Sequence, residues 1–398
     1  MIWTLSILDM KNNNYPRILF IGEYPDVFDK IKSPYKSETT FDQTFDPTFF
    51  VNNGGNRGNL VWQESVFRIF NYNHLKSRRV TFEYLYDNQK KIDDEFDFIV
   101  INLACWINNR PFRPNNFISK LKFKKSKVIC LGNGCIKNGY INSNPNLSKD
   151  FFHPSVVESL RWMFDNAEVF SVRGESTMST LKCLFNIDSV ALGCPSAYAF
   201  PDSINNISLK PFKDSLLASA DYISKYDGVN FPALYNEFNK FKSSSYFCQS
   251  SFQFSEGSNI EFPKNTKLNQ IGNVKINECD GSLKNYPFEI KAIDKIYAPN
   301  NIDNWRGVLS MHDYYIGTRL HCAMLSLQAG VFPFIFYDDE RPLEVANLIG
   351  MPHMNSGSND SFKLEEIFSK KNLKNFQQKY KESYNIFRKT ISQTGLVL

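Results

Sequence analysis

Short apolar runs alternate along the chain with segments whose apolar residues recur every three or four positions. In the first half the apolar runs lie at residues 17–22, 96–103, 127–132, 168–172 and 189–192. Uninterrupted runs of this length are typical of strands buried on both faces of a parallel sheet. Between them, residues 155–167 and 176–185 have the spacing of helices that cover such a sheet. The alternation predicts an α/β fold with parallel sheets.

The same alternation resumes after a stretch rich in Pro, Asn and Ser at residues 201–212, where we place a domain boundary. Beyond it, strands are predicted at 215–222 (with a helix as the alternative), 245–249, 295–298, 314–316 and 331–336, and helices at 232–241, 302–311 and 342–350. A long Lys-rich segment at 364–390, interrupted around Asn372, is also prone to form helix. The prediction is a first domain at 1–203, a second at 204–362, and a helical tail at 363–398 that packs back on the first domain.

One stretch, YYIGTRLHCAMLSLQAGVFPFIFYD at residues 314–338, combines a strand, a turn, a helix and a second strand. Thr318 is the predicted N-cap, and Gly330 is expected to end the helix. Arg319 and His321 then lie in the first turn, beside free backbone N–H groups and the positive end of the helix dipole. This arrangement suits an anion, and an imidazole there can also move a proton. An Arg-x-His sequence in a β-α turn is, however, common in proteins where it has no special function. The prediction of an anion site therefore depends on other stretches of the chain.

Arg173 has the same position in the first half, after the strand at 168–172 and before the helix at 176–185. A single arginine in a loop is usually a solvated charge. Two arginines in matching turns of two α/β halves indicate instead a clamp for phosphate or carboxylate, because guanidinium groups bind both oxyanions in a bidentate fashion.

A loop rich in Gly and Asn, VNNGGNRGN at residues 51–59, precedes an amphipathic helix that is predicted to run through Phe70. Gly and Asn tolerate positive φ angles and allow the backbone to approach a ligand closely. The loop matches neither the Walker motif nor the G-x-G-x-x-G fingerprint, which disfavours a P-loop enzyme and a Rossmann dehydrogenase. An ordinary surface turn is an equally good interpretation of this loop.

Composition narrows the class of protein. The 398 residues carry a net charge of +5 with scattered basic residues, which does not indicate a nucleic-acid binder but suits an enzyme of anionic small molecules. The eight cysteines form no C-x-x-C pair and no Cys/His cluster with zinc spacing, so we expect reduced thiols and no metal site. Neither a signal peptide nor a long apolar span is evident, which predicts a soluble cytoplasmic protein.

The order of these motifs resembles the polysaccharide pyruvyl transferase family. The resemblance covers residues 17–352 and comprises the Gly/Asn loop, S-V-R-x-x-S, a G-x-P turn at 193–195, G-T-R-L-H and A-G-x-x-P. It implies two Rossmann-like domains in a glycosyltransferase-B-like arrangement, with the active site in the cleft between them. The implied reaction moves a pyruvyl group from phosphoenolpyruvate to two hydroxyls of a sugar, forming a cyclic ketal. The acceptor would belong to an exopolysaccharide or other surface polysaccharide, or to its lipid-linked precursor.

By this resemblance Arg173 and Arg319 hold the phosphate and carboxylate of the donor, and His321 is the acid/base. Substrate-binding positions are expected at Asn56, Gly58, Asn59, Ser171, Ser176, Thr318, Leu320, Asp338 and Arg341. Phosphoenolpyruvate and the sugar are the expected partners, with no further cofactor and no nucleic acid. Contact with the inner face of the membrane and a homo-oligomer stay open. Asn59 and Cys194 stand where the family often has Asp, so two carboxylates are absent.

Two other functions compete with this interpretation. A glycosyltransferase of the same two-domain architecture would also place phosphate at a helix N-terminus, but would use a nucleotide-sugar donor. A carbohydrate-binding member without catalytic activity would keep the fold and release no phosphate from phosphoenolpyruvate. Trp106, Trp305 and Tyr337 are candidates to stack on a sugar ring, although core packing is the simpler interpretation for aromatics in so aromatic a chain.

Overall fold

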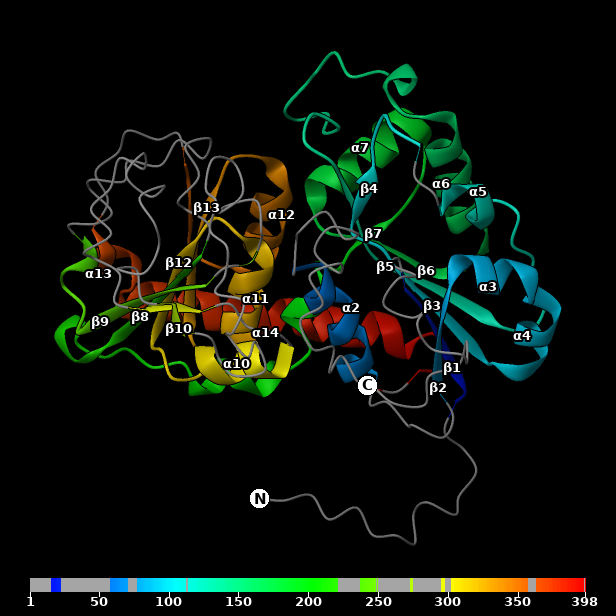
Figure 1. Ribbon diagram of the computed structural model, residues 1–398. Coiled ribbons are helices and arrows are strands. Elements are labelled where there is room, and N and C mark those ends of the chain that lie inside the picture. Colours follow the sequence, from blue (N-terminus) through cyan, green and yellow to red (C-terminus); the bar gives the residue numbers. More distant parts are fainter. Residues whose placement is uncertain are drawn as a thin grey trace, which may run out of the picture.

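The structure is a computed structural model, and it describes residues 16–22, 58–70, 77–111, 114–220, 237–247, 249, 273–274, 295–297, 302–356, 363–396 and 398. Its strands form two sheets, one in each half of the chain, and helices cover their faces (Figure 1). The first half lies on the right of Figure 1 and the second on the left. The α/β fold with parallel sheets is therefore confirmed.

The first sheet has the strand order β2-β1-β3-β5-β6-β7, with β4 beside β5, and its described pairings are all parallel. Its strands are β1 (Ile18–Gly22), β2 (Ser77–Thr81), β3 (Phe98–Asn102), β4 (Cys105–Ile107), β5 (Lys127–Cys135), β6 (Ala167–Val172) and β7 (Val190–Ala191). β5 extends past the apolar run at 127–132 and continues through Asn133 and Gly134. There β4 pairs with β5, Cys105 opposite Gly134, and the Trp106 indole donates to Asn133 Oδ1 at 2.8 Å.

The helices of the first half include some that the apolar periodicity predicted and others, at residues 82–95 and 115–118, that it did not. They are α2 (Gly58–Ile69), α3 (Phe82–Asp87), α4 (Gln89–Glu95), α5 (Asn115–Ile118), α6 (Pro154–Asn166) and α7 (Glu175–Phe185). The predicted helices at 155–167 and 176–185 are confirmed to within one residue. The Gly/Asn loop does lead into a helix, α2, but residues 51–57 lie outside the described part of the chain.

The second sheet has the order β10-β11-β9-β8-β12-β13-β14 and is parallel except at its edge strand β10. Its strands are β8 (Leu216–Ala220), β9 (Ser243–Phe247), β10 (Asn273–Val274), β11 (Lys295–Tyr297), β12 (Tyr314–Gly317), β13 (Phe332–Tyr337) and β14 (His353–Asn355). Residues 216–220 are thus a strand, which decides against the alternative helix. The chain builds the sheet outward in one direction from β8 and then in the other from β12. Ligands of doubly wound sheets bind at the carboxyl ends of the strands at such a switch point.

The helices of the second half are α10 (Ile302–Leu309), α11 (Leu320–Gln328), α12 (Glu340–Ile349), α13 (Leu364–Ile367) and α14 (Lys370–Ser392). α12 begins two residues before Pro342, because Asp339 accepts the Arg341 N–H as its N-cap. The interruption predicted around Asn372 lies slightly earlier, since the Ser369 hydroxyl caps α14 by accepting the Asn372 N–H at 3.3 Å. Most of the helix predicted at 232–241 lies outside the described residues.

The C-terminal helix α14 joins the two halves. Figure 1 shows it running beneath the second sheet and on toward the first. The Tyr380 hydroxyl donates to Ala197 O at 2.7 Å, and Lys127 Nζ in β5 donates to Thr394 O at 2.7 Å. The predicted return of the tail to the first half is confirmed, whereas the exact domain limits stay predictions.

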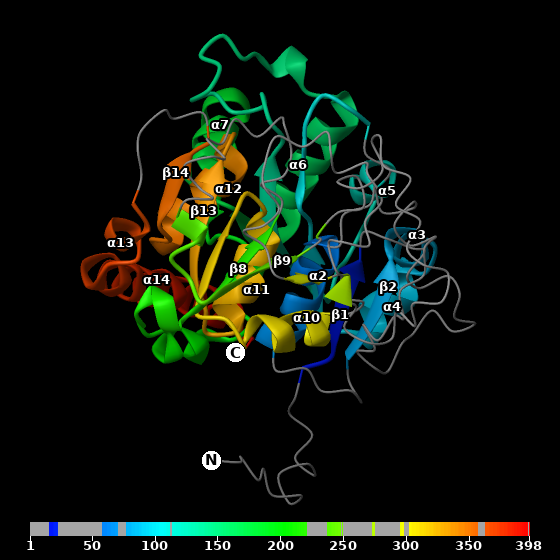
Figure 2. The same ribbon diagram turned by 60° about the vertical axis from the view of Figure 1, so that its left-hand side comes forward.

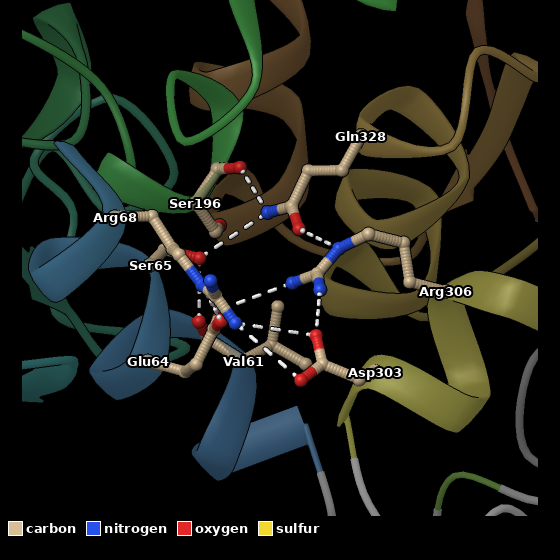
Figure 3. A network of polar contacts seen from close by, with 8 residues as sticks. All are labelled: Val61, Glu64, Ser65, Arg68, Ser196, Asp303, Arg306 and Gln328. Atoms are coloured by element: carbon tan, nitrogen blue, oxygen red, sulfur yellow. Dashed lines mark hydrogen bonds and ion pairs between the residues drawn. The ribbon is translucent and has the colours of Figure 1, made fainter. Parts of the chain in front are cut away.

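A second contact between the halves is polar and buried (Figure 3). Glu64 on α2, only 2% exposed, accepts from Arg68 Nε at 2.6 Å and from Arg306 Nη2 on α10 at 3.0 Å. Arg306 also donates to Gln328 Oε1 at the end of α11, at 3.0 Å. Because a buried charge left without its partner is costly, this network holds α2 against α10 and α11.

Apolar packing is continuous between the halves. One cluster of buried residues includes side chains of α2, α11 and α14, and a second covers the opposite face of the first sheet. Trp106 and Trp305 are each 1% exposed, so both belong to the core. Among the helices that the structure describes, none is both long and apolar enough to cross a lipid bilayer.

Candidate active site

The turn between β12 and α11 lies at the switch point of the second sheet. A Cβ on Gly317 would lie 2.4 Å from Ala220 O and from the Tyr315 hydroxyl, so only glycine fits here. Thr318 was predicted as the N-cap of α11, and this is wrong. Its N–H extends the strand ladder to Ala220 O at 3.3 Å, which moves the N-cap one residue on to Arg319.

His321 lies in the first turn of α11, as predicted, and is 8% exposed. Within the described part of the chain, its Nε2 has no hydrogen-bond partner. Burial, together with the guanidiniums of Arg173 and Arg319, lowers the pKa of His321 to about 3. The imidazole is therefore uncharged at neutral pH. Arg173 belongs to the first half, so its guanidinium acts electrostatically on His321 across the boundary between the halves.

Arg173 extends from the end of β6 and is 3% exposed. Its Nε donates to Gly132 O at 3.1 Å, and its Nη1 approaches Cys105 Sγ at 3.1 Å. The side chain passes over Gly134, where a Cβ would lie 3.0 Å from Arg173 Cδ. Arg173 is therefore fixed in place by the ends of β4 and β5 before any ligand binds.

Arg341, at the start of α12, adds a third guanidinium. It is held by Asp339, which accepts from Arg341 Nε at 2.8 and 2.9 Å. Burial raises the pKa of the Cys105 thiol, and both Arg173 and Arg341 oppose that rise, so both guanidiniums lie near this thiol. The predicted cations thus gather between the halves: Arg173 from the first, Arg319 and Arg341 from the second.

A sequence model of the polysaccharide pyruvyl transferase family matches residues 61–341, which is most of the chain. The chain belongs to this family. The members of this family are transferases, and the family implies a sugar or polysaccharide as the acceptor.

Other comparisons concern curated sequences and solved structures. No curated protein sequence matches the chain. Similar solved structures include Staphylococcus aureus MnaA with UDP, at 11% identity and a TM-score of 0.46, covering 96% of this chain and 98% of that chain. A putative UDP-N-acetylglucosamine 2-epimerase from Listeria monocytogenes has 9% identity and a TM-score of 0.48, covering 95% of this chain and 96% of that chain. Anabaena HepE in complex with UDP and glucose has 9% identity and a TM-score of 0.43, covering 95% of this chain and 100% of that chain.

The other positions expected from the family resemblance fall into three groups. Ser171 in β6 is fully buried, and its hydroxyl accepts the N–H of Gly132 in β5 at 3.3 Å. Its side chain therefore supports the neighbouring strand. Asp338 pairs with Lys137 at 3.0 Å on the exposed rim between the halves. The rest lie at the helix starts near these turns: Gly58 and Asn59 in α2, Ser176 in α7, and Thr318 and Leu320 before and in α11. Asn56 lies outside the described residues.

Carboxylates and thiols give no indication of a metal centre. In the described part of the chain, no group of three or more His, Cys, Asp or Glu side chains is placed to hold a metal ion. Cys194, at the position where the family often has Asp, is buried with its Sγ 2.9 Å from Ser196 Oγ. This thiol is therefore directed into the core of the first half.

Glu344 on α12 was not singled out from the sequence. Its carboxylate accepts the Thr177 N–H at 3.1 Å and the Tyr140 hydroxyl at 3.1 Å, both from the first half. Burial raises its pKa to about 7, against the effect of the bonds from Thr177. The sequence does show Glu344 next to two apolar residues, Val345 and Ala346, within a predicted helix, and both neighbours are buried. Its partner Thr177, however, is 167 residues away in the sequence.

Proposed function

We propose that this protein transfers a pyruvyl group from phosphoenolpyruvate to two hydroxyls of a sugar in a surface polysaccharide or its lipid-linked precursor, forming a cyclic ketal. Membership of the family supports polysaccharide pyruvylation in general. The observation that carries the finer statement is the burial of His321, with an unpartnered Nε2 among the described residues, in the first turn of α11. Arg319 of the same half is the N-cap of that helix, and the buried Arg173 of the other half also acts on His321 electrostatically.

The cations suit a donor with two anionic groups. Phosphoenolpyruvate carries a phosphate and a carboxylate, and guanidinium groups bind either one bidentately. Arg319 is at the N-terminus of α11, where the helix dipole adds to its attraction for an anion. Arg173 belongs to the first half, whereas Arg319 and Arg341 belong to the second, so the donor would be bound between the halves rather than on one of them.

His321 is the proposed acid/base. Because its imidazole is uncharged before the donor binds, it is ready to accept a proton from an acceptor hydroxyl. The negative charges of the donor then offset the guanidiniums, which raises the pKa of His321 and lets it hold that proton and pass it on.

The reaction balances without an oxidant or a cofactor. Two C–O bonds form at C2 of the donor, and the C2–O bond to phosphate breaks. The two acceptor hydroxyls lose two protons: one is added to C3, which becomes a methyl group, and the other leaves on the phosphate. Arg173, Arg319 and Arg341 would stabilise the phosphate as its charge develops.

The donor decides between this proposal and a glycosyltransferase. Phosphoenolpyruvate at about a hundred times its dissociation constant should stabilise the protein by about 2.7 kcal/mol, seen as a rise in Tm, whereas UDP-glucose should not. With a diol-bearing sugar, phosphoenolpyruvate should release one phosphate for each ketal formed, measured by phosphate assay and mass spectrometry. Stabilisation by the nucleotide sugar alone, with no phosphate release, would reject the proposal.

A further inference from the structure

Glu344 is a buried acidic residue to which the proposed chemistry gives no role. It is 4% exposed and lies on α12, and its carboxylate is directed at the first turn of α7 in the other half. It accepts from the backbone N–H of Thr177 at 3.1 Å and from the Thr177 hydroxyl at 2.9 Å. Thr177 is the third residue of α7, so Glu344 satisfies a backbone N–H that the helix itself leaves unpaired. A helix of one half is thus capped by a side chain of the other.

The backbones of the two helices are in close contact at this point. A Cβ on Gly174, the N-cap of α7, would lie 2.6 Å from Glu344 Cβ and 3.0 Å from Glu344 O. Both ribbon views show α7 and α12 facing each other between the halves (Figures 1 and 2). Gly174 directly follows Arg173, so this contact is one residue away from a guanidinium of the proposed site.

The same contact is connected to the other guanidiniums through the second sheet. Arg341 is three residues before Glu344, about one turn earlier on α12. α12 follows β13, and β13 pairs with β12, which leads into Arg319 and His321. Moving α12 relative to α7 would therefore change the distance between Arg173 and the rest of the site.

Two further contacts accompany Glu344 at the exposed rim. Glu340 Oε1 accepts from the Ser143 hydroxyl at 2.7 Å, and Asp338 pairs with Lys137 at 3.0 Å. Exposed contacts of this kind contribute little, whereas a buried charged group that loses its partners is costly. Among these three acids Glu344 carries the contact, and Glu340 provides a matched control on the same helix.

We propose that Glu344 is a positioning residue, which sets Arg173 against His321 and Arg319 by tying α12 to the first turn of α7. The kinetic part of this inference rests on the proposed function, since it concerns how the donor is clamped. Glu344 would not touch the donor. Its effect would be exerted through the relative position of the two halves.

The test compares full-length Glu344→Ala, Glu344→Gln and the control Glu340→Gln. Loss of the tie should lower kcat/KM for phosphoenolpyruvate by roughly 10- to 100-fold in Glu344→Ala, chiefly through KM, because misplaced binding groups are costly. Glutamine can still accept from the Thr177 N–H and donate to its hydroxyl, so Glu344→Gln should recover most of the loss. Glu340→Gln should behave as wild type.

Hydrogen exchange provides a readout that does not need activity. The amides of residues 174–180 should exchange faster in Glu344→Ala than in wild type or Glu344→Gln. Wild-type exchange in Glu344→Ala would overturn the inference, even if the wild type proved inactive with phosphoenolpyruvate and the proposed function failed. Faster exchange with unchanged KM would also overturn the positioning role. Should Glu344→Ala not fold, Glu344→Asp, which keeps the charge but withdraws it from Thr177, replaces it.

Discussion

Arg173 and Arg319 each follow a buried parallel strand and precede a helix, but the two helix N-termini are used differently. α7 receives a carboxylate from the opposite half, with Glu344 accepting the Thr177 N–H at 3.1 Å. At α11 the corresponding N–H, that of Cys322, donates to the uncharged amide Oε1 of Gln249 at 3.1 Å. His321 in the first turn is buried, and its Nε2 has no partner among the described residues. The positive end of α7 thus meets an acidic side chain of the protein, whereas that of α11 meets a neutral amide and keeps its attraction for an anion.

The two arginines that precede these helices also differ in their surroundings. Arg173 is 3% exposed and bonded to Gly132 O, whereas Arg319 is only half-buried. The comparison teaches that a strand–Arg–helix pattern predicts affinity for an anion, while the surroundings decide whether that anion is a neighbouring helix's side chain or a ligand.

The largest effect is expected from His321→Ala. If the N-terminus of α11 is the reacting side, phosphate release from phosphoenolpyruvate should fall on the order of 100-fold or more, the usual scale of acid–base catalysis. His353→Gln is a suitable control, because His353 lies on β14 and its Nδ1 is 2.8 Å from Met351 O. Normal turnover of His321→Ala would show that the N-terminus of α11 is not the reacting side.

Substituting each arginine should distinguish a role in binding phosphoenolpyruvate from a role in stabilising the fold. Arg319→Ala and Arg173→Ala should each weaken phosphoenolpyruvate binding by about 10- to 100-fold, the scale of one or two lost charged hydrogen bonds. Arg173→Ala should also lower Tm, and by more than Arg319→Ala, because it leaves Gly132 O without its side-chain donor and removes a buried cation that acts on Glu344. Calorimetric titration and thermal unfolding measure the two effects, and an equal loss of Tm in both variants would contradict the distinction.

Gly174→Ala should weaken the contact between α7 and α12. The added Cβ would meet Glu344 Cβ at 2.6 Å, and such overpacking typically costs about 1–3 kcal/mol of unfolding free energy. Gly307→Ala on α10 is the matched control, since nothing lies within 4 Å of its added Cβ. That variant should be neutral or up to about 1 kcal/mol more stable, from helix propensity. Denaturant unfolding compares the two, and equal effects would show that the helices can move apart freely.

At neutral pH the smallest expected effect is that of His321 on stability, which develops only as the pH falls. His321 has a pKa of about 3 in the folded chain against 6.5 for an ordinary histidine, so below pH 6.5 only the unfolded chain takes up this proton. Its contribution to stability is complete above pH 6.5 and falls as the pH drops toward 3, by up to about 1.4 kcal/mol per pH unit.

The difference in unfolding free energy between wild type and His321→Gln isolates this contribution. It should be constant above pH 6.5 and shift in favour of the variant below that pH. Glu344, whose pKa burial raises to about 7, acts in the opposite sense, since its stabilising proton is lost as the pH rises through 7. Both proteins carry Glu344, so its effect cancels. A constant difference at all pH values would mean that His321 is not buried among cations.

Local patterns predicted the elements that carry the site. The strand ending at Gly317, the helix ending before Gly330 and the strand before Arg173 all agree with the structure. The errors concern where an element begins or ends, not whether it is a strand or a helix. β5 continues through Asn133 because β4 pairs beside it. α11 starts one residue later than predicted because the Thr318 N–H still bonds to β8. Such continuations depend on neighbouring strands that no local window contains.

By itself, the sequence determined where the strands and helices around the site lie, where a helix ends at glycine, and that Arg173, Arg319 and His321 follow strand ends. These features arise from side-chain periodicity and backbone sterics over a few residues. Only the tertiary structure decided that these residues meet, that His321 is uncharged, and that Glu344 caps α7. Burial, electrostatic shifts and a cap supplied from 167 residues away all depend on how the two halves are brought together.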